Sequence, residues 1–115
     1  MIETTIKQFL ESKLSVPVLM EVPKSTVSQF VIIEKTGGAQ VNQIPSSIIT
    51  IQSYGASKYD AAVLNDQVKE WMLDWKVGLI TLNDVVSVHL NGDYDFTDTS
   101  TKHYRYQAVF EITHY

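Results

Sequence analysis

The histidines are the side chains of this sequence best suited to acid–base or metal chemistry. They are His89, His103 and His114. A helical metal site needs two such ligands about one turn apart on one face, and no pair of these histidines has that spacing. The chain has no cysteine, which excludes disulfides, cysteine-ligated zinc and thiol chemistry. We therefore expect no metal site, and we interpret each histidine as an ordinary strand or surface residue.

A short acidic stretch imitates the start of a calcium loop. Asn91, Asp93 and Asp95 stand where the first, third and fifth ligands of such a loop belong. The next position needs glycine for a sharp turn and holds Phe96, and the position of the bidentate glutamate holds Lys102. The stretch is therefore predicted to be a solvated acidic turn without calcium.

Two other patterns could suggest a ligand, but a structural interpretation is stronger for each. Gly37 and Gly38 follow an apolar run without the lysine, the spacing or the following helix of a phosphate-binding loop. Trp71 and Trp75 could form a stacking platform, but they share an apolar helical stripe and are expected in the core. No serine lies in a nucleophile elbow. The sequence thus predicts a protein that is not an enzyme, with no catalytic residue and no cofactor.

Length and composition indicate one folded domain, residues 1–115. Hydrophobic residues make up 44% and charged residues 19%, as in ordinary folded domains rather than disordered chains. The formal net charge of −4 argues against nonspecific nucleic-acid binding, which needs clustered lysine and arginine. No apolar run approaches the ~20 residues of a membrane span, and the first residues do not resemble a signal peptide. We expect cytoplasmic synthesis and no membrane or specific nucleic-acid partner.

Helical periodicity marks two segments. Residues 1–15 place apolar side chains on one stripe, and Pro17 ends the segment. Residues 57–76 carry the stronger stripe, with Ser57 as N-cap and Gly78 as the stop. The two stripes consist of Ile2, Ile6, Phe9, Leu10 and Leu14, and of Ala61, Leu64, Val68, Trp71, Met72 and Trp75.

The remaining pattern predicts strands. Residues 30–35 and 47–54 have the β-branched or alternating composition of strands. The segment between them far exceeds the roughly two to five residues of a hairpin loop, and its paired glycines permit a sharp turn. We interpret residues 36–47 as a long hairpin arm. Further strands are expected at 18–22, 85–90 and 102–115, with a turn or bulge at Asn91 and Gly92 and an exposed loop or ragged strand end at 93–101.

The order helix, strands, helix, strands predicts an α+β domain. Strands that neighbour one another in sequence favour a mainly antiparallel sheet of about four to five strands, with both helices packed on one face. There, Trp71, Met72 and Trp75 are expected to pack against Phe30, Ile32, Phe110 and the first helix. The other face is either solvated or covered by another subunit, and it would carry Thr50, Gln52, Arg105, Gln107 and Glu111.

Short motifs along most of the chain carry a family resemblance. They are Val16-Pro17-Val18, Glu21-Val22-Pro23, Phe30-Val31, Glu34-Lys35-Thr36-Gly37-Gly38, Ile51-Gln52-Ser53-Tyr54-Gly55, Ala61-Ala62 and Tyr104-Arg105-Tyr106. Together they resemble the tail terminator and tail-completion (minor tail) proteins of long-tailed phages and prophages. The acidic stretch 93–98 matches no fixed pattern of that family, so no family role is carried to it.

The resemblance implies a structural virion-assembly protein. Such a protein forms a homo-oligomeric ring, commonly a hexamer, which caps the tail tube and joins it to the head connector or neck protein. It would act in the host cytoplasm during assembly and remain in the virion tail. The alternatives are a head-completion or neck adaptor protein and, from another class, a small ligand-binding or enzymatic α+β domain with an apolar pocket and converging polar groups. The candidate interface residues are Glu34, Lys35, Thr36, Gly37, Gly38, Gln40, Asn42, Gln43, Asp93, Asp95 and Asp98.

Overall fold

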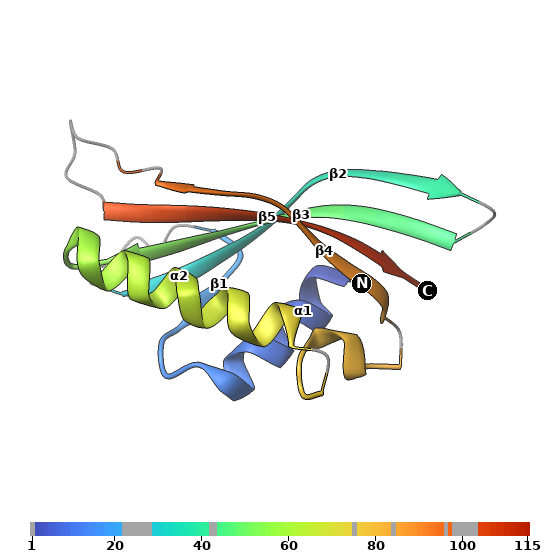
Figure 1. The fold of residues 1–115 in the computed structure, drawn as a ribbon, viewed down its shortest axis with the longest axis horizontal. Coiled ribbons are helices and arrows are strands. Elements are labelled where there is room, and N and C mark those ends of the chain that lie inside the picture. Colours follow the sequence, from blue (N-terminus) through green and yellow to red (C-terminus); the bar gives the residue numbers. More distant parts are fainter. Residues whose placement is uncertain are drawn as a thin grey trace.

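The computed structural model describes residues 2–21, 29–41, 44–74, 76–83, 85–95, 97 and 104–115. A helix, three strands, a second helix with a short 3₁₀ helix and two further strands follow one another along the chain, as Figure 1 shows. The elements are α1 (Ile2–Lys13), β1 (Val18–Leu19), β2 (Phe30–Val41), β3 (Ile44–Gly55), α2 (Lys58–Leu73), the 3₁₀ helix η1 (Leu79–Thr81), β4 (Val85–Asp95) and β5 (Tyr104–His114).

The described strands form one five-stranded sheet in the order β1-β2-β3-β5-β4. Every pair is antiparallel except β1 with β2, where Val18 lies beside Val31. β1 is shorter than the predicted strand 18–22, whose last residue lies outside the described part of the chain. Both α-helices lie on the same side of the sheet (Figure 1). The predicted α+β class, the mainly antiparallel sheet and the packing of the helices are confirmed.

Local hydrogen bonds fix both ends of α2. The Asp60 N–H donates to Ser57 Oγ at 3.1 Å, which satisfies one of the amides left free at a helix start. The helix ends at Leu73, because Asp74 is extended and its carboxylate accepts the Lys76 N–H at 2.7 Å. When an aspartate side chain accepts a hydrogen bond from a backbone N–H two residues later, that bond replaces a helical hydrogen bond and favours the end of the helix. The predicted N-cap is therefore confirmed, and the predicted end near residue 76 is too late.

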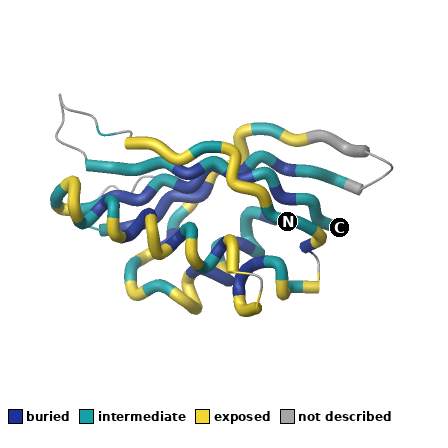
Figure 2. The backbone as a smooth tube through the Cα atoms, in the orientation of Figure 1, coloured by how far each residue is buried: buried dark blue, intermediate teal, exposed yellow. Residues whose placement is uncertain are grey.

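One apolar cluster fills the space between the helices and the sheet, as the buried segments of Figure 2 indicate. In the predicted stripe of the first helix Ile2, Ile6, Phe9 and Leu10 are buried, whereas Leu14 follows the end of α1 and packs against the cluster from its margin. In α2, Met72 is completely buried while Trp71 packs against the cluster from its margin. Trp75 lies outside the described residues. Phe110 belongs to the same cluster, so that part of the predicted packing is confirmed.

The predicted contact of α2 with Phe30 and Ile32 is wrong. Side chains alternate between the faces of a strand, and in β2 the residues that face the helices are Val31 and Ile33. Phe30 and Ile32 form a separate small cluster with Tyr54 on the opposite face. An unbroken apolar run shows that both faces of a strand are buried, but it does not show which residues face which layer.

β2 and β3 continue through the segment interpreted as a hairpin arm, beyond the predicted strand bounds at residues 35 and 47. They pair along their whole length, and the last pair, Val41 with Ile44, leaves only residues 42–43 to connect them. Gly37 and Gly38 are ordinary strand residues without a left-handed φ, and the only irregularity is a bulge at Thr36. Glycine has no side chain to contribute to the alternating pattern. The sequence pattern therefore ends at the glycines, although the backbone pairing of the two strands continues.

Among the described helices, none is long and apolar enough to cross a bilayer.

Candidate interface surfaces

The hairpin arm, defined here as residues 36–41 and 44–47, extends the sheet along the long axis of a molecule measuring 44 × 25 × 23 Å (Figure 1). β5 accompanies β3 only as far as Ser46, which lies opposite Thr113. On the other side, β1 covers only Val31 and Ile32 of β2. Among the described residues, no strand lies beside the outer part of the arm. A two-stranded ribbon is marginally stable in water by itself, so the arm depends on support that the body does not supply.

Side-chain bonds hold the base of the arm. On the face away from the helices, Thr36 Oγ1 and Thr50 Oγ1 lie 3.1 Å apart across the bulge. On the helix face, Ser47 Oγ lies 2.8 Å from His114 Nε2. The serine is only 1% exposed, so its hydroxyl is closed to substrate. This Ser–His pair is therefore a structural bond, not a nucleophile with its base.

A chain of hydrogen bonds crosses the open face of the sheet, the face without helices. Arg105 Nη1 donates to the Tyr54 hydroxyl at 3.0 Å, which donates to Gln52 Oε1 at 3.1 Å. Gln52 Nε2 then donates to Gln107 Oε1 at 3.0 Å, and Gln107 Nε2 donates to the Tyr94 hydroxyl. Because all these bonds run in one direction, each polarises the next. The predicted polar face is thus internally ordered rather than a set of independently solvated side chains.

Aromatic packing borders one end of this chain of bonds. The rings of Phe30 and Tyr54 stack with centroids 4.4 Å apart, and both residues are buried. The Arg105 guanidinium lies 5.7 Å from the Tyr54 ring centroid, within the range of a cation–π contact. The open face therefore combines a buried aromatic end with a polar centre, and both are held in fixed positions.

The end of the sheet that lies opposite the arm is tied to α2. Asn65, which is 2% exposed, donates from Nδ2 to Asp93 Oδ1 at 2.7 Å, and Lys69 Nζ lies 2.5 Å from Asp93 Oδ2. Lys58, at the start of α2, lies 2.9 Å from Asp95 Oδ2. Asp93 and Asp95 are strand residues of β4, so the predicted solvated acidic turn is wrong and the strand continues past its predicted end at Leu90. Their carboxylates join the strand to the helix.

These contacts shift the pKa values of the groups involved. Hydrogen bonds from Thr97 and Lys58 lower the pKa of the Asp95 carboxyl from 3.8 to about 2, and the Asp95 carboxylate raises the pKa of Lys58. Burial acts to raise the pKa of Asp93, but the bonds from Lys69 and Asn65 together outweigh it, so the pKa falls. The bond to Asp93 raises the pKa of Lys69. All four shifts favour the charged forms that make the contacts.

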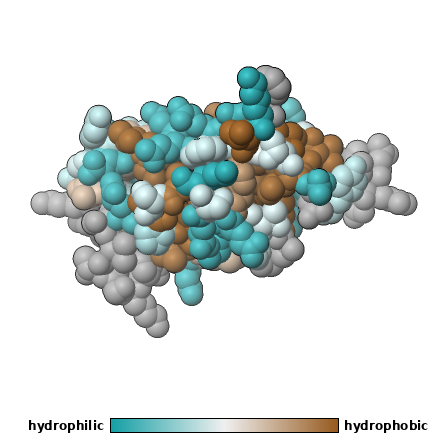
Figure 3. Space-filling view, turned by 90° about the horizontal axis from the view of Figure 1, so that it is seen from below, coloured by the Kyte–Doolittle hydropathy of each residue, from teal (hydrophilic) through white to brown (hydrophobic). Residues whose placement is uncertain are grey.

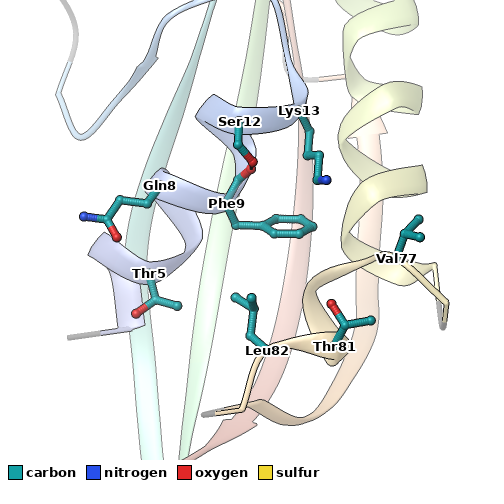
Figure 4. A pocket seen from close by; sticks show the side chains of 8 residues that line it. All are labelled: Thr5, Gln8, Phe9, Ser12, Lys13, Val77, Thr81 and Leu82. Atoms are coloured by element: carbon teal, nitrogen blue, oxygen red, sulfur yellow. Dashed lines mark hydrogen bonds between the residues drawn. The ribbon is translucent and has the colours of Figure 1, made fainter.

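A groove of about 420 Å³ lies between α1 and the segment around η1 (Figure 4). Phe9, Val77 and Leu82 supply its apolar part, and Lys13 is the single ionisable residue among the described residues that line it. The Lys13 ammonium lies 5.9 Å from the Phe9 ring centroid and 5.1 Å from that of Trp71. A lone lysine held over two rings has no acid or base partner with which to catalyse proton transfer. In the described residues, no group of histidines and carboxylates could hold a metal ion.

The predicted interface residues fall into two separate groups. Glu34, Lys35, Thr36, Gly37 and Gly38 lie at the base of the arm, and Gln40 follows in β2. The group at the other end contains Asp93 and Asp95. Asn42, Gln43 and Asp98 lie outside the described residues.

Sequence reasoning missed the helix residues that hold Asp93 and Asp95. A signal was present, because Asn65 is a polar residue beside the apolar stripe of α2 and Lys69 lies one turn further on. Seen from the helix side, the surface has polar and apolar patches of comparable extent (Figure 3). Neither models of known protein families nor curated proteins give a match to this chain. Its class must therefore be argued from these surfaces and from the short motifs.

Proposed function

We propose that this protein is a tail terminator, a structural protein that ends the growth of a phage tail tube and joins the tail to the head connector. The observation that carries the proposal is the arm, a paired ribbon whose outermost residues, 40–41 and 44–45, have no described strand beside them. Such a ribbon is suited to a neighbouring subunit, because unpaired strand edges bind other strands. The motifs that resemble tail terminators support the same function.

The function requires two unlike surfaces and no bond-making chemistry. A tube that grows by adding identical rings recreates the same free surface at each step, so growth does not end by itself. A terminator must bind that surface and present a different one outward. The arm and the end of the sheet tied to α2 supply two such surfaces, and they differ in shape and charge. Among the described residues of these surfaces, the Lys58–Asp95, Lys69–Asp93 and Ser47–His114 pairs are engaged in structural contacts.

A neck adaptor is the second candidate within virion assembly, because it shares the need for self-association and for two partners. A small ligand-binding or enzymatic domain is the candidate from another class. The groove at Phe9 is the described cavity that best fits it, but its one ionisable side chain, Lys13, lies over aromatic rings. Among the described residues that line this groove, no second charged side chain is present to orient a ligand together with Lys13.

Deletion of the gene from the phage or prophage that carries it tests the proposal. A terminator deletion should yield filled heads without joined tails, together with tail tubes of abnormal length. Tails of normal length that fail to attach, beside empty or leaking heads, would identify a neck adaptor instead. Wild-type particles would contradict both assembly functions. Negative-stain images of the purified protein should show rings.

A further inference from the structure

A second groove lies between α2 and the outer edge of β4. It encloses about 380 Å³ and is open to solvent along the strand. Leu73 of α2 and Leu90 of β4 border it with side chains that are 41% and 38% exposed. Exposed leucines beside a strand edge are a feature of sites that accept an extended segment as an added strand. The remaining residues that line the groove are Asp66, Lys69 and Glu70.

The charges of this groove favour a cationic partner. Lys69 is already engaged, because its ammonium lies 2.5 Å from Asp93 and 3.3 Å from Asp66. No described cation pairs with Glu70, and Asp66 remains 70% exposed. The groove therefore carries an excess of negative charge, and an approaching lysine or arginine would neutralise part of it.

The edge of β4 is open for pairing over a limited length. In the described chain no strand lies on its outer side, since β5 covers only the inner one. Register shifts at Val86 and Asn91 interrupt the strand, so the regular edge consists of residues 87–90 and 92–95. Bulges of this kind restrict which strands can pair with an edge. A partner must therefore match both a short backbone ladder and the groove beneath it.

The arm of a second copy has the features that this site requires. No described strand lies on the outer edge of β2 from Ile33 onward, because β1 stops opposite Ile32. Lys35 lies on this edge and is exposed. Lys35 pairs with Ile49, a core residue, and its side chain runs beside Gly38 on the helix face. In a sheet continued from one copy to the next, Lys35 would thus point to the side on which the acidic groove lies.

Strand direction agrees with this pairing. Because β2, β3, β5 and β4 alternate in direction across the sheet, β2 and β4 run opposite to one another. If copies repeat around an axis along the strands, the arm of one copy meets β4 of the next as an antiparallel neighbour, the more common kind of pair. Such a contact joins two different surfaces head to tail, and head-to-tail contacts close into a ring when the rotation between successive copies completes a full turn, as the proposed function requires.

We infer that the outer edge of β2 of one copy, from Lys35 into the arm, pairs with β4 of the next copy, with Lys35 above Asp66 and Glu70 in the groove beside α2. The inference rests on the proposed function for the ring and adds which surfaces form it. Both surfaces belong to one sheet, so the assembled ring would contain a sheet that continues through every subunit.

Cross-linking tests the contact directly, because the chain has no cysteine of its own. The variant Lys35→Cys with Glu70→Cys, treated with a short bismaleimide, should give a covalent ladder that ends at the number of subunits in the ring. The matched control keeps Lys35→Cys and places the second cysteine at Gln8, an exposed residue of α1. The control should remain uncross-linked. A ladder of equal yield from both variants, or from neither, would overturn the inference.

Charge reversal provides a second measurement on the uncross-linked protein. Lys35→Glu and Glu70→Lys should each weaken self-association by about fivefold or more in sedimentation velocity, and the double variant should recover most of the loss. Rings that are visible in micrographs but insensitive to both reversals would overturn this contact and leave the proposed function intact. Monomers at every concentration would overturn the contact, and the deletion phenotype would then decide the proposed function separately.

Discussion

The two ends of the sheet are built from polar, glycine-bearing runs of comparable composition, but their structures differ. Each contains a polar, glycine-bearing run, around Gly37 at one end and around Gly92 at the other. At the second end, carboxylates of β4 bond to three residues of α2, which lies directly beneath (Figure 1). At the first end, the ribbon continues past the last residue of β3 that β5 accompanies. The polar character of a strand end therefore does not show whether that end is fixed or projects from the body. What decides it is whether a helix packs against that end.

This difference separates stability from assembly in the proposed terminator. The end tied to α2 contributes to the folding free energy of the monomer, so changes there should unfold the protein. The outer part of the arm, which β5 does not accompany, contributes little to the folded body, so changes there should alter association first. Elements that function by binding are commonly drawn from the least stable parts of a fold. Substitutions of matched size at the two ends can test this separation.

The largest effect is expected for Gly55→Ala. Gly55 ends β3 where α2 begins, and a Cβ there would lie 2.4 Å from the Ala61 nitrogen and 2.9 Å from the Asp60 carbonyl carbon. Backbone atoms cannot move aside as a flexible side chain can, so the helix would have to shift away from the sheet. We expect a loss of about 3 kcal/mol in the free energy of unfolding, measured by urea denaturation. A loss below about 1 kcal/mol would show that this junction is not tightly packed.

A smaller loss, about 2 kcal/mol, is expected for Asn65→Ala. The substitution removes the buried amide that donates to Asp93 and leaves a small cavity in α2. Part of the cost is offset, because Asn65 Oδ1 has no hydrogen-bond partner in the structure. Gln67→Ala, an exposed position on the same helix, is the matched control and should change stability by less than about 0.5 kcal/mol. Equal losses in the two variants would contradict the proposed role of the Asn65–Asp93 bond.

The contacts of Asp95 should make stability depend on pH in the acid range. Its pKa is about 2 in the folded protein and 3.8 ordinarily, so the folded state binds its proton less readily than the unfolded state. The contribution is fully present well above pH 3.8 and is lost as the pH falls through about 2. Relative to Asp95→Asn, the wild type should melt at a higher temperature near neutrality, and this advantage should disappear near pH 2. A constant difference across the acid range would contradict this assignment.

Thr97→Val sharpens the same measurement. It removes the hydroxyl that donates to Asp95 Oδ1 at 2.6 Å and keeps the Lys58 contact. The acid transition should therefore move toward the ordinary carboxyl pKa.

Side-chain periodicity predicted the parts of this fold in which side chains determine position. The stripe of α1, the Ser57 cap and the inward face of β5 follow from spacing alone, and so does the α+β class. The length of β2 could not be predicted in this way, because Gly37 and Gly38 have no side chains to alternate. The face of the sheet on which Phe30 lies could not be predicted either, because all residues of its run are apolar and the run shows no alternation.

The candidate surfaces were predicted less completely than the fold. Residues of the arm and of the polar face could be named, because polar residues on strands are visible in the sequence. The contacts of Asp93 could not be predicted, since they join residues 28 positions apart that meet only when α2 packs on the sheet. The one-directional chain through Gln52 and Gln107 likewise depends on strand register, which the sequence left open.

The smallest effect, and the clearest test of the arm, is expected for Gly37→Ala. A Cβ at this position would lie 3.4 Å from Ile48 Cγ1, an ordinary contact, and φ is not left-handed. Alanine restricts the unfolded chain more than glycine does, so the variant should be more stable by about 0.5 kcal/mol.

At Gly38 the added Cβ would lie 3.2 Å from the Ser46 carbonyl oxygen, so Gly38→Ala should gain less stability than Gly37→Ala or lose slightly. Amide exchange in the arm should change little in either variant as a monomer and slow down when the protein assembles. If Gly37→Ala instead cost as much as Gly55→Ala, the arm would be part of the body, and the separation of stability from assembly would fail.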